Sequence, residues 1–319
     1  MLSPARPTSL LLPLFAYFLE TSTDTLVFLT SESLKLTKMA SIDDVQVMNK
    51  GNLTEVKPIP AVELSRKLQK TLLKLKGKFM SDDGKAVDYV GMKKSSEFAD
   101  YLKEALELQR VDLSNLNEKE KKVFFINVYN SLTIHGLLEQ PKLPDSVLSV
   151  QQFFRTVGYI IGGLVYSLDD IEHGVLRSNR PHPASIKPMF GPSDPRIKFI
   201  CKQLDPRIHF AVVCGAKSCP AIGVYTVENV ETALDSAARN FCAQEVEMRN
   251  EMDEVLLSKL FQWYRADFGE TEVDVLKWIM PYLSQAQHDR CSILILKLEK
   301  LGPVALRYKD YNWSINQKS

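Results

Sequence analysis

The chain has 319 residues, of which 45% are hydrophobic and 25% charged, and its formal net charge at pH 7 is +1. This composition is typical of a globular protein that is long enough for a sizeable core. The charge balance, with no basic run and no interleaving of aromatic and basic residues, excludes an extended nucleic-acid-binding surface. The five cysteines are few for this length and odd in number. They predict free thiols in a reducing, cytoplasmic compartment rather than a disulfide framework.

Residues 1–58 are expected to form an N-terminal extension, and residues 59–319 one globular domain. The apolar run Leu10–Leu19 resembles the hydrophobic part of a secretory signal peptide. Alternatively, Met39 is a start in its own right, and residues 1–38 are an unstructured upstream extension. The run is short and interrupted by a proline, and no later segment approaches the length of a bilayer span. We therefore expect a soluble protein without a stable membrane span, secreted only if the upstream extension acts as a signal peptide.

Apolar periodicity and turn residues predict most of the secondary structure. In chain order, the predicted elements are a helix over 62–79, a short strand over 87–90, helices over 95–108 and 117–139, a short helix over 147–157, a hairpin over 159–166, a helix over 171–177, a wrapping loop over 178–196, a helix from Thr226 to about 244, a strand over 254–257, an aromatic lid over 261–268, a helix over 273–285, a helix or strand over 292–298, and a closing strand over 304–308. With the central stretch described below, they predict a mixed α/β fold of the α+β class. We expect a single domain with a small central sheet wrapped by many helices.

The helix predicted over 117–139 is apolar on all sides and yet carries polar residues. Its apolar residues point all round the axis from Val123 onward, so the helix must be buried. Its polar residues form one stripe, made of Asn127, Asn130, Ser131 and His135. Each of these side chains would cost about 1–3 kcal/mol if it were buried without a hydrogen-bond partner. We therefore expect the polar stripe to meet partners, either as a structural network that tethers loops or as one wall of a site.

The helix predicted over 171–177 carries a second polar set. Ser167 and Asp170 are placed to cap it. Asp170 and His173 are three residues apart, and His173 and Arg177 are four apart, so each pair shares a helix face. Local ion pairing is one interpretation of this set. The other is a wall that binds an anion or handles a proton.

The stretch 205–222 is the expected centre of the fold. It opens with a turn at Asp205-Pro206 and continues as an apolar strand over 209–213, predicted to be the central strand of the sheet. It ends in Cys214-Gly-Ala-Lys-Ser-Cys-Pro220, where glycine and proline exclude regular structure. A buried strand that delivers two thiols, a serine and a lysine into a tight loop is a common location for chemistry in α/β proteins.

These residue types fit nucleophilic thiol chemistry, because a histidine or another positive charge lowers the pKa of a nearby thiol. Cys214 or Cys219 would be the nucleophile, His135 or His209 the base, and Asn127 or Asp170 the orienting third group. The candidate binding residues are Asn127, Asn130, Asp170, His173, Arg177, Arg207, Lys217 and Ser218.

The cysteines also suggest two further chemistries. Cys214 and Cys219 lie five apart in a turning loop and could oxidise to a disulfide, although the spacing is not C-x-x-C. Together with Cys201 and His209 they match no paired metal-ligand spacing, so no metal is predicted. The chain has no glycine-rich phosphate loop, no H-E-x-x-H and no G-x-S-x-G. We therefore expect no cofactor and neither nucleotide nor serine-hydrolase chemistry.

Several sequence blocks match one family pattern in the right order. They are Phe124–Asn130 with Ile134-His135, Asp169–Arg177, Asp205–Phe210, Cys214–Pro220, Phe261–Phe268 and Asp310–Trp313. On these blocks the chain resembles the DUF547 family (domain of unknown function 547) over roughly residues 85–312. Phe125 stands where the family often has tryptophan, which is a conservative departure. The resemblance implies no settled activity.

The leading hypothesis from the sequence is a thiol-dependent enzyme that acts by acyl transfer or hydrolysis on an unknown small molecule or protein. The second is a non-catalytic interaction or scaffold module, in which the same polar residues form a structural network. The third is a redox-active thiol pair. A histidine nitrogen within hydrogen-bonding reach of a cysteine sulfur would favour the enzyme.

Overall fold

The structure is a computed structural model that describes residues 44–53, 57–84, 86–249, 253–300 and 305–318. The apolar run Leu10–Leu19 and the alternative start at Met39 lie outside these described residues. None of the described helices has both the length and the apolar character needed to cross a bilayer.

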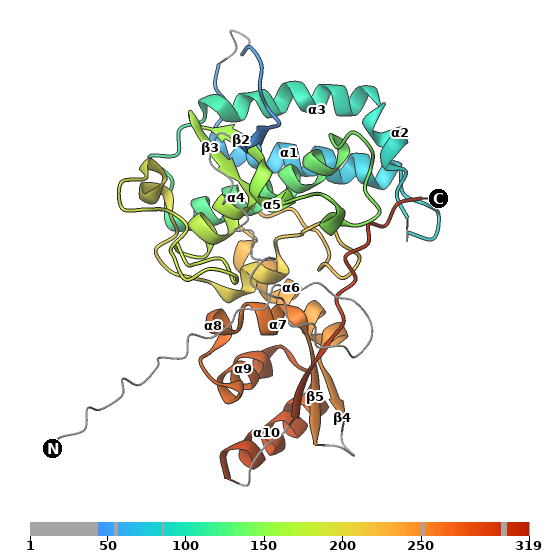
Figure 1. Cartoon of the computed structure of the whole chain (residues 1–319), viewed down its shortest axis with the longest axis vertical. Helices are drawn as coiled ribbons and strands as arrows, with labels where there is room; N and C mark the ends of the chain where they lie inside the picture. Colours follow the sequence, from blue (N-terminus) through green and yellow to red (C-terminus); the bar gives the residue numbers. More distant parts are fainter. Residues whose placement is uncertain (1–43, 54–56, 85, 250–252, 301–304, 319) are drawn as a thin grey trace, which may run out of the picture.

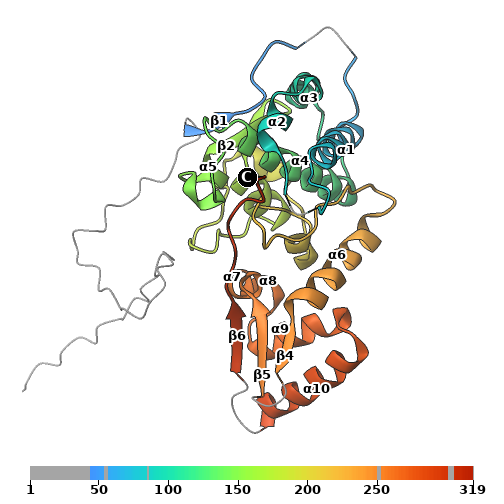
Figure 2. The same ribbon diagram turned by 90° about the vertical axis from the view of Figure 1, so that its right-hand side faces the viewer.

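The fold belongs to the α+β class and contains two small mixed sheets rather than the one central sheet that we expected. In the first sheet, β2 (Val157–Ile161) pairs in parallel with β1 (Gln46–Val47) and antiparallel with β3 (Leu164–Ser167). In the second, β5 (Glu254–Ser258) pairs antiparallel with β4 (Glu247–Arg249) and in parallel with β6 (Ala305–Lys309). The two sheets lie at opposite ends of the elongated molecule, as both views show (Figures 1 and 2). Each is therefore covered by its own set of helices.

The α-helices are α1 (Ala61–Lys78), α2 (Tyr89–Lys93), α3 (Ser96–Leu106), α4 (Glu118–Leu138), α5 (Phe153–Thr156), α6 (Val230–Glu245), α7 (Lys259–Trp263), α8 (Arg265–Phe268), α9 (Glu272–Ile279) and α10 (Gln285–Lys300). Short 3-10 helices are η2 (Glu107–Arg110), η3 (Val147–Ser149), η5 (Pro195–Phe199), η6 (Pro206–Phe210) and η8 (Met280–Tyr282), and η4 (Asp170–Leu176) is a π-helical segment. The predicted helices over 62–79, 95–108 and 117–139, the 159–166 hairpin, and the strands over 254–257 and 304–308 are confirmed within a few residues.

Helix α4 is the buried centre of the first half of the fold. It begins as expected at Asn117, whose side chain accepts hydrogen bonds from the backbone N–H groups of Lys119 and Glu120 in a capping box. Every residue from Val123 to Leu138 is buried. The helix packs against α1 on one side and against β2 on another, as Figure 2 shows. Its polar stripe is therefore enclosed by protein, so the side chains of the stripe need hydrogen-bond partners within the fold.

The predicted central strand over 209–213 is wrong. Pro206–Phe210 is the 3-10 helix η6, which the Asp205 side chain caps through the N–H of Arg207. The next residues form a buried loop that turns back on the helix, because Ala211 and Val212 donate their N–H groups to the carbonyl of Ile208. A short apolar run indicates burial equally well in a strand, a helical turn or a loop. The sequence pattern predicted the burial but could not distinguish these conformations.

Four further boundaries differ from expectation. Val87 forms only isolated bridges, and the helix α2 follows it where a strand over 87–90 was predicted. The helix expected over 147–157 divides into η3 and α5. Thr226 does not cap α6 as predicted. Its hydroxyl accepts from the N–H of Asn229, and Asn229 is the N-cap of the helix. The helix over 273–285 stops early as α9, because Pro281 cannot continue it. Residues 292–298 lie within α10.

An aromatic cluster lies between the two halves of the molecule, each of which contains one sheet. Phe210 from η6 packs on Phe241 of α6, with ring centroids 4.7 Å apart. Phe268 of α8 packs on Phe261 of α7 at 4.9 Å and on Trp278 of α9 at 4.7 Å. Phe261 and Phe268 are buried, so the predicted aromatic lid over 261–268 covers the core as expected. The same segment also brings Asp267 to Arg177, which follows η4, and to His209 of η6.

Candidate functional site

The loop that carries Cys214 and Cys219 is held by one buried amide on α4. Asn130 donates from Nδ2 to the carbonyl of Ala211 at 2.9 Å, and its Oδ1 accepts from the N–H of Val213 at 2.9 Å. The side chain thus pairs with both backbone groups of the loop in the way a neighbouring strand would. This pairing explains how an apolar, strand-like run remains buried without belonging to a sheet.

The other members of the polar stripe also meet partners. Asn127 pairs with both backbone polar groups of Tyr225, at 2.8 and 3.0 Å. Ser131 donates to Gln69 Oε1 at 3.0 Å, and Gln69 in turn donates to the carbonyl of Gly223. The stripe therefore tethers the 211–225 segment at several points. This is the structural network that we expected as one of its two interpretations, and the amides of Asn127 and Asn130 are occupied by backbone.

The two cysteines of the loop lie side by side. Their sulfur atoms are 2.7 Å apart, and the N–H of Cys214 points to Cys219 Sγ at 3.2 Å. The hydroxyl of Tyr311 lies 3.5 Å from each sulfur. Gly215 makes the turn between them with φ +89°, and a Cβ there would come within 2.7 Å of Leu137. Both the positive φ and the close approach require glycine.

The surroundings distinguish the two thiols. Burial raises the pKa of Cys219, but hydrogen bonds from Cys214, from the Tyr311 hydroxyl and from backbone N–H groups outweigh it and lower that pKa to about 7. Burial and donation to Cys219 raise the pKa of Cys214 well above its usual value. Burial also lowers the pKa of Lys76 in α1, while the charge of a Cys219 thiolate acts to raise it. These directions, together with the Cys214 N–H that points to Cys219 Sγ, favour Cys219 as the thiolate of the pair and Cys214 as its hydrogen-bond donor.

The remaining cysteines lack these features. Cys201, Cys242 and Cys291 are buried. Burial raises the pKa of Cys201 and Cys242 to about 12 and that of Cys291 to about 11. Buried protonated thiols of this kind are inert.

His209 belongs to a separate buried ion-pair network. Its Nε2 lies 2.8 Å from Asp267 Oδ2, and its ring stacks on Tyr264 with centroids 3.9 Å apart. Asp267 also accepts from Arg177, at 2.5 and 3.0 Å, and from Arg180 at 3.0 Å. Burial alone would raise the pKa of Asp267, but the hydrogen bonds from His209 and Arg177 lower it strongly.

His135 is held in an aromatic cluster elsewhere. Its Nδ1 lies 2.7 Å from the hydroxyl of Tyr159, which is 2.7 Å from the hydroxyl of Tyr101. Burial lowers the pKa of His135 to about 3, so the ring is neutral. Among the residues that the structure describes, no hydrogen bond joins a histidine nitrogen to a cysteine sulfur. The structure does not bring the candidate bases His135 and His209 to the candidate nucleophiles.

The polar set of η4 joins the network of Asp267. Arg177 Nη1 donates to His173 Nδ1 at 2.8 Å, which confirms that these two residues share a helix face. Asp170 accepts from the N–H and hydroxyl of Ser167, as expected for a cap, and pairs with Arg196 at 2.8 Å. Of the two expected local contacts, only that of His173 with Arg177 is found among the described residues, because Asp170 pairs with Arg196 from 26 positions away instead of with His173.

Glu172, also on η4, connects this network to α4. It accepts hydrogen bonds from Tyr129 at 2.9 Å and from Tyr264 at 2.6 Å. Its two carboxylate oxygens are thus occupied by tyrosine hydroxyls, one from α4 and one from the turn between α7 and α8.

Asp169, His173 and His182 bring their polar atoms within 4.8 Å of one another, and these residue types can bind a metal. Their hydrogen bonds instead favour histidine tautomers that carry a proton on Nε2. His173 Nδ1 accepts from Arg177, and His182 Nδ1 accepts from the N–H of Ala184 at 3.0 Å. A neutral imidazole whose Nδ1 accepts carries its proton on Nε2, whereas metal-binding histidines usually donate from their second nitrogen. The cluster thus presents N–H groups to Asp169, whose pKa burial and Glu172 raise to about 7.

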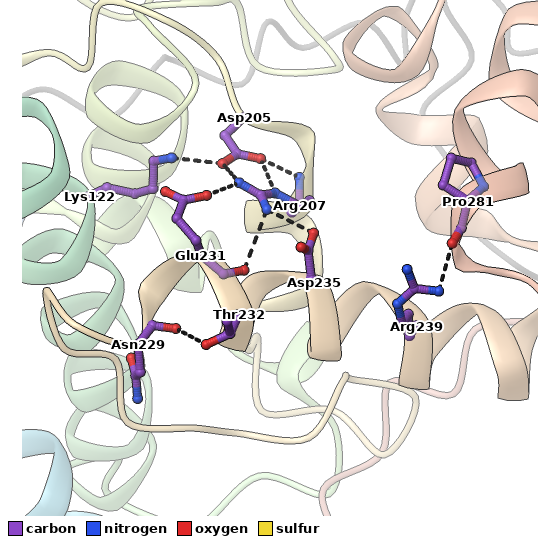
Figure 3. Close-up of polar contacts among 9 residues, drawn as sticks. All are labelled: Lys122, Asp205, Arg207, Asn229, Glu231, Thr232, Asp235, Arg239 and Pro281. Atoms are coloured by element: carbon purple, nitrogen blue, oxygen red, sulfur yellow. Dashed lines mark hydrogen bonds and ion pairs between the residues drawn. The ribbon is translucent and has the colours of Figure 1, made fainter.

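Arg207 anchors η6 and does not reach the thiols. Figure 3 shows its guanidinium between the carboxylates of Asp205, Glu231 and Asp235, with Lys122 of α4 on the far side of Asp205. The nearby Arg239 fixes α6 to the second half of the fold through the carbonyl of Pro281 at 2.7 Å (Figure 3). The guanidinium of Arg207 is engaged with these three carboxylates, so no contact supports the predicted role of Arg207 in binding.

Residues 311–318, here called the C-terminal strap, close the cysteine loop. Figure 1 shows this red segment running from β6 along the first half of the fold. The N–H groups of Lys217 and Ser218 donate to the carbonyls of Ser314 and Asn312. The hydroxyl of Ser218 accepts from the N–H of Asn312 at 2.9 Å. Ser218 is thus a structural contact, and Lys217 directs only its side chain to solvent.

Three important residues were not among the predicted site residues. Tyr311 and Asp267 lie in the sequence blocks Asp310–Trp313 and Phe261–Phe268, but nothing in those blocks connects them to the cysteines or to His209. Lys76 is one of several lysines that alternate along α1 and carries no signal of its own. Only the tertiary structure brings these residues to the site.

Comparison with known proteins gives one match. Residues 113–242 match a family model described as "Protein of unknown function, DUF547". This range contains α4, η4 and the cysteine loop but neither Asp267 nor Tyr311, so it is narrower than the range we expected. No curated protein and no solved structure matches the chain.

Proposed function

Because residues 113–242 match the model of a family of unknown function, we propose a function from the site itself. Cys214 and Cys219 act as a redox-active dithiol that exchanges with the disulfide of a substrate. The observation that supports this proposal is the distance of 2.7 Å between the two sulfur atoms. A disulfide bond is about 2.05 Å long, so the bond could form with a shift of well under 1 Å.

The roles of the two thiols follow from their environments. The Cys219 thiolate attacks one sulfur of the substrate disulfide, forms a mixed disulfide and releases the first substrate thiolate. Cys214 then loses its proton and attacks Cys219 Sγ, which releases the second substrate thiolate. The protein is oxidised to the Cys214–Cys219 disulfide by two electrons, and the substrate disulfide is reduced to two thiols. The proton of Cys214 passes to a released thiolate or to water.

The acyl-transfer hypothesis has less support from the geometry. A cysteine hydrolase needs a base beside its thiol, whereas His209 is paired with Asp267 and His135 with Tyr159. The dithiol needs no histidine, because the donors that stabilise the Cys219 thiolate are Cys214, Tyr311 and backbone. The scaffold hypothesis agrees with the stripe on α4 but leaves the paired sulfurs without a role.

Oxidation of the purified protein is expected to join Cys214 to Cys219 within one chain. Treatment with a slight excess of a small disulfide, followed by alkylation, digestion and mass spectrometry, should show this crosslink. Cys214→Ser should instead trap a mixed disulfide on Cys219, because the resolving thiol is absent. Cys201→Ser, which removes a buried thiol, is the control and should behave as the native chain does. An oxidised native chain without the crosslink would contradict the proposal.

The reactivity of Cys219 is expected to follow a pKa near 7, below the value of about 8.5 for a free thiol. Its alkylation rate by iodoacetamide should therefore rise to half its maximum near neutral pH. Tyr311→Phe removes a donor to the thiolate and should move this midpoint to higher pH. Tyr308→Phe is the matched control, because its charged neighbours are Glu272 and Arg265 rather than the sulfurs. An unchanged midpoint in Tyr311→Phe would exclude the proposed role of that hydroxyl.

A further inference from the structure

A cavity of about 320 Å³ lies beside Cys219. One wall is the segment from Lys217 to Tyr225, which includes Cys219 itself, and the other is one face of α6. Cys214 is not among the lining residues. The thiol that we assign as the attacking group is therefore the one that lines the cavity, and the resolving thiol is not part of the lining.

The α6 wall combines small and hydrogen-bonding side chains. Ala233 and Ala237 are four residues apart, so they leave space on one helix face. Ser236, Asn240 and Gln244 follow the same four-residue spacing and line the cavity with them. Phe210 and Phe241 add an apolar floor. A wall of this kind accommodates the body of a small polar molecule, with several donors and acceptors for it.

The position of Lys217 favours an anion at the rim of the cavity. Among the described lining residues, Lys217 is positively charged, whereas Glu245 and the Cys219 thiolate proposed above are negative. The Glu245 carboxylate lies 3.6 Å from Lys309 Nζ, which offsets its charge, whereas the Lys217 side chain is exposed at the rim. Lys217 is two residues from Cys219 in the same loop, so a carboxylate held by its ammonium group stays close to the sulfur.

We propose that this cavity binds a low-molecular-weight disulfide that carries a carboxylate, and that Lys217 attracts the carboxylate while Cys219 attacks the sulfur. The inference rests on the dithiol function proposed above and names its substrate class. The volume is at the small end of the range for ligand sites, about 300–1,000 Å³. Such a cavity admits a small molecule but not the backbone that flanks a disulfide in a folded protein.

Three disulfides of similar length and different charge test the inference: the dianion dithiodipropionate, the neutral bis(hydroxyethyl) disulfide and the dication cystamine. The measured quantity is the rate of formation of the Cys214–Cys219 crosslink at pH 7, divided by the rate at which each reagent oxidises a free model thiol. We expect the anionic reagent to be preferred over the neutral one by about three- to tenfold, and the preference to fall at high salt.

Two variants locate the effect. Lys217→Gln should abolish the preference for the anionic over the neutral reagent. Lys187→Gln, at an exposed lysine outside the cavity lining, is the matched control and should retain the preference. Ala237→Leu fills the cavity and should slow all three disulfides while leaving alkylation by the smaller iodoacetamide unaffected.

The outcomes separate the two proposals. If the crosslink forms but the normalised rates are equal and Lys217→Gln changes nothing, the substrate class is wrong and the dithiol stands. If none of the reagents produces the crosslink, the dithiol function itself fails. Loss of the normalised preference for the anionic reagent in Lys217→Gln, with the preference retained in Lys187→Gln, supports the inference.

Discussion

Replacement of Asp267 by alanine is expected to lower the free energy of unfolding by about 3–5 kcal/mol. Asp267 is buried and compensates the positive charge of Arg177, whose guanidinium is also buried. It also accepts from His209, another buried side chain. Removal of the carboxylate leaves the Arg177 charge without its partner in the core, and such an uncompensated charge costs more than the ion pair contributes. Urea denaturation followed by circular dichroism measures the change.

The contribution of Asp267 should depend on pH. Its pKa is lowered in the folded chain, so the unfolded chain binds a proton first as the pH falls. The stabilisation is therefore fully present above the unfolded pKa of about 3.9 and is lost as the pH falls below it towards the folded pKa. The difference in stability between the native chain and Asp267→Asn should be largest near neutral pH and should narrow below about pH 4.

The control for this prediction is Asp289→Ala. Asp289 lies on α10, where its side chain is 65% exposed and its histidine partner is also partly exposed. Exposed pairs of this kind contribute about 0–1 kcal/mol, so the variant should unfold nearly as the native chain does. Equal effects of the two substitutions would contradict the assigned role of Asp267 in the core.

Asn130→Ala is expected to destabilise the chain by about 2–4 kcal/mol, because it leaves the carbonyl of Ala211 and the N–H of Val213 buried without partners. The same change should release the cysteine loop, so alkylation of Cys214 should accelerate in the native state. Thermal unfolding measures the first effect, and mass-spectrometric mapping of alkylation measures the second. Leu at this position would leave the same backbone groups unpaired and should be no better tolerated.

Asn115→Ala is the matched control, because the Asn115 side chain is exposed and bonds only to the nearby Asp112 at 3.3 Å. We expect a change within about 0.5 kcal/mol and no effect on the thiols. If Asn130→Ala resembled this control, the loop would have to be held by contacts other than the α4 amide.

The sequence predicted α4 and its polar stripe well, because both depend on local patterns. The cap at Asn117, the all-round apolar surface and the need of Asn127 and Asn130 for partners are each readable from residues within a few turns. The stretch 205–214 was predicted less well. Its apolar character indicated burial, but side-chain amides from α4 replace the strand partners that we expected, and a single sequence does not show such substitutions.

Prediction of the site was limited by long-range pairing. The proximity of Cys214 and Cys219 was expected, since five residues in a turning loop keep them close. The proposed contact between a cysteine and His209 was not found, because Asp267 pairs with His209 from 58 positions away. Tyr311 reaches the sulfurs from more than ninety positions away. Periodicity and motifs carry no information on which distant segments meet.

The C-terminal strap also determines when the site becomes complete during folding. Asn312 pairs with Ser218 across 94 positions, and Asn316 pairs with Tyr89 across 227. Contacts between residues that are so far apart in the sequence form slowly, because a long loop must close before they can form. On the ribosome, the cysteine loop emerges well before Tyr311. Both thiols are therefore synthesised before the Tyr311 hydroxyl that later lies 3.5 Å from each sulfur, and their surroundings are complete only after the strap has docked.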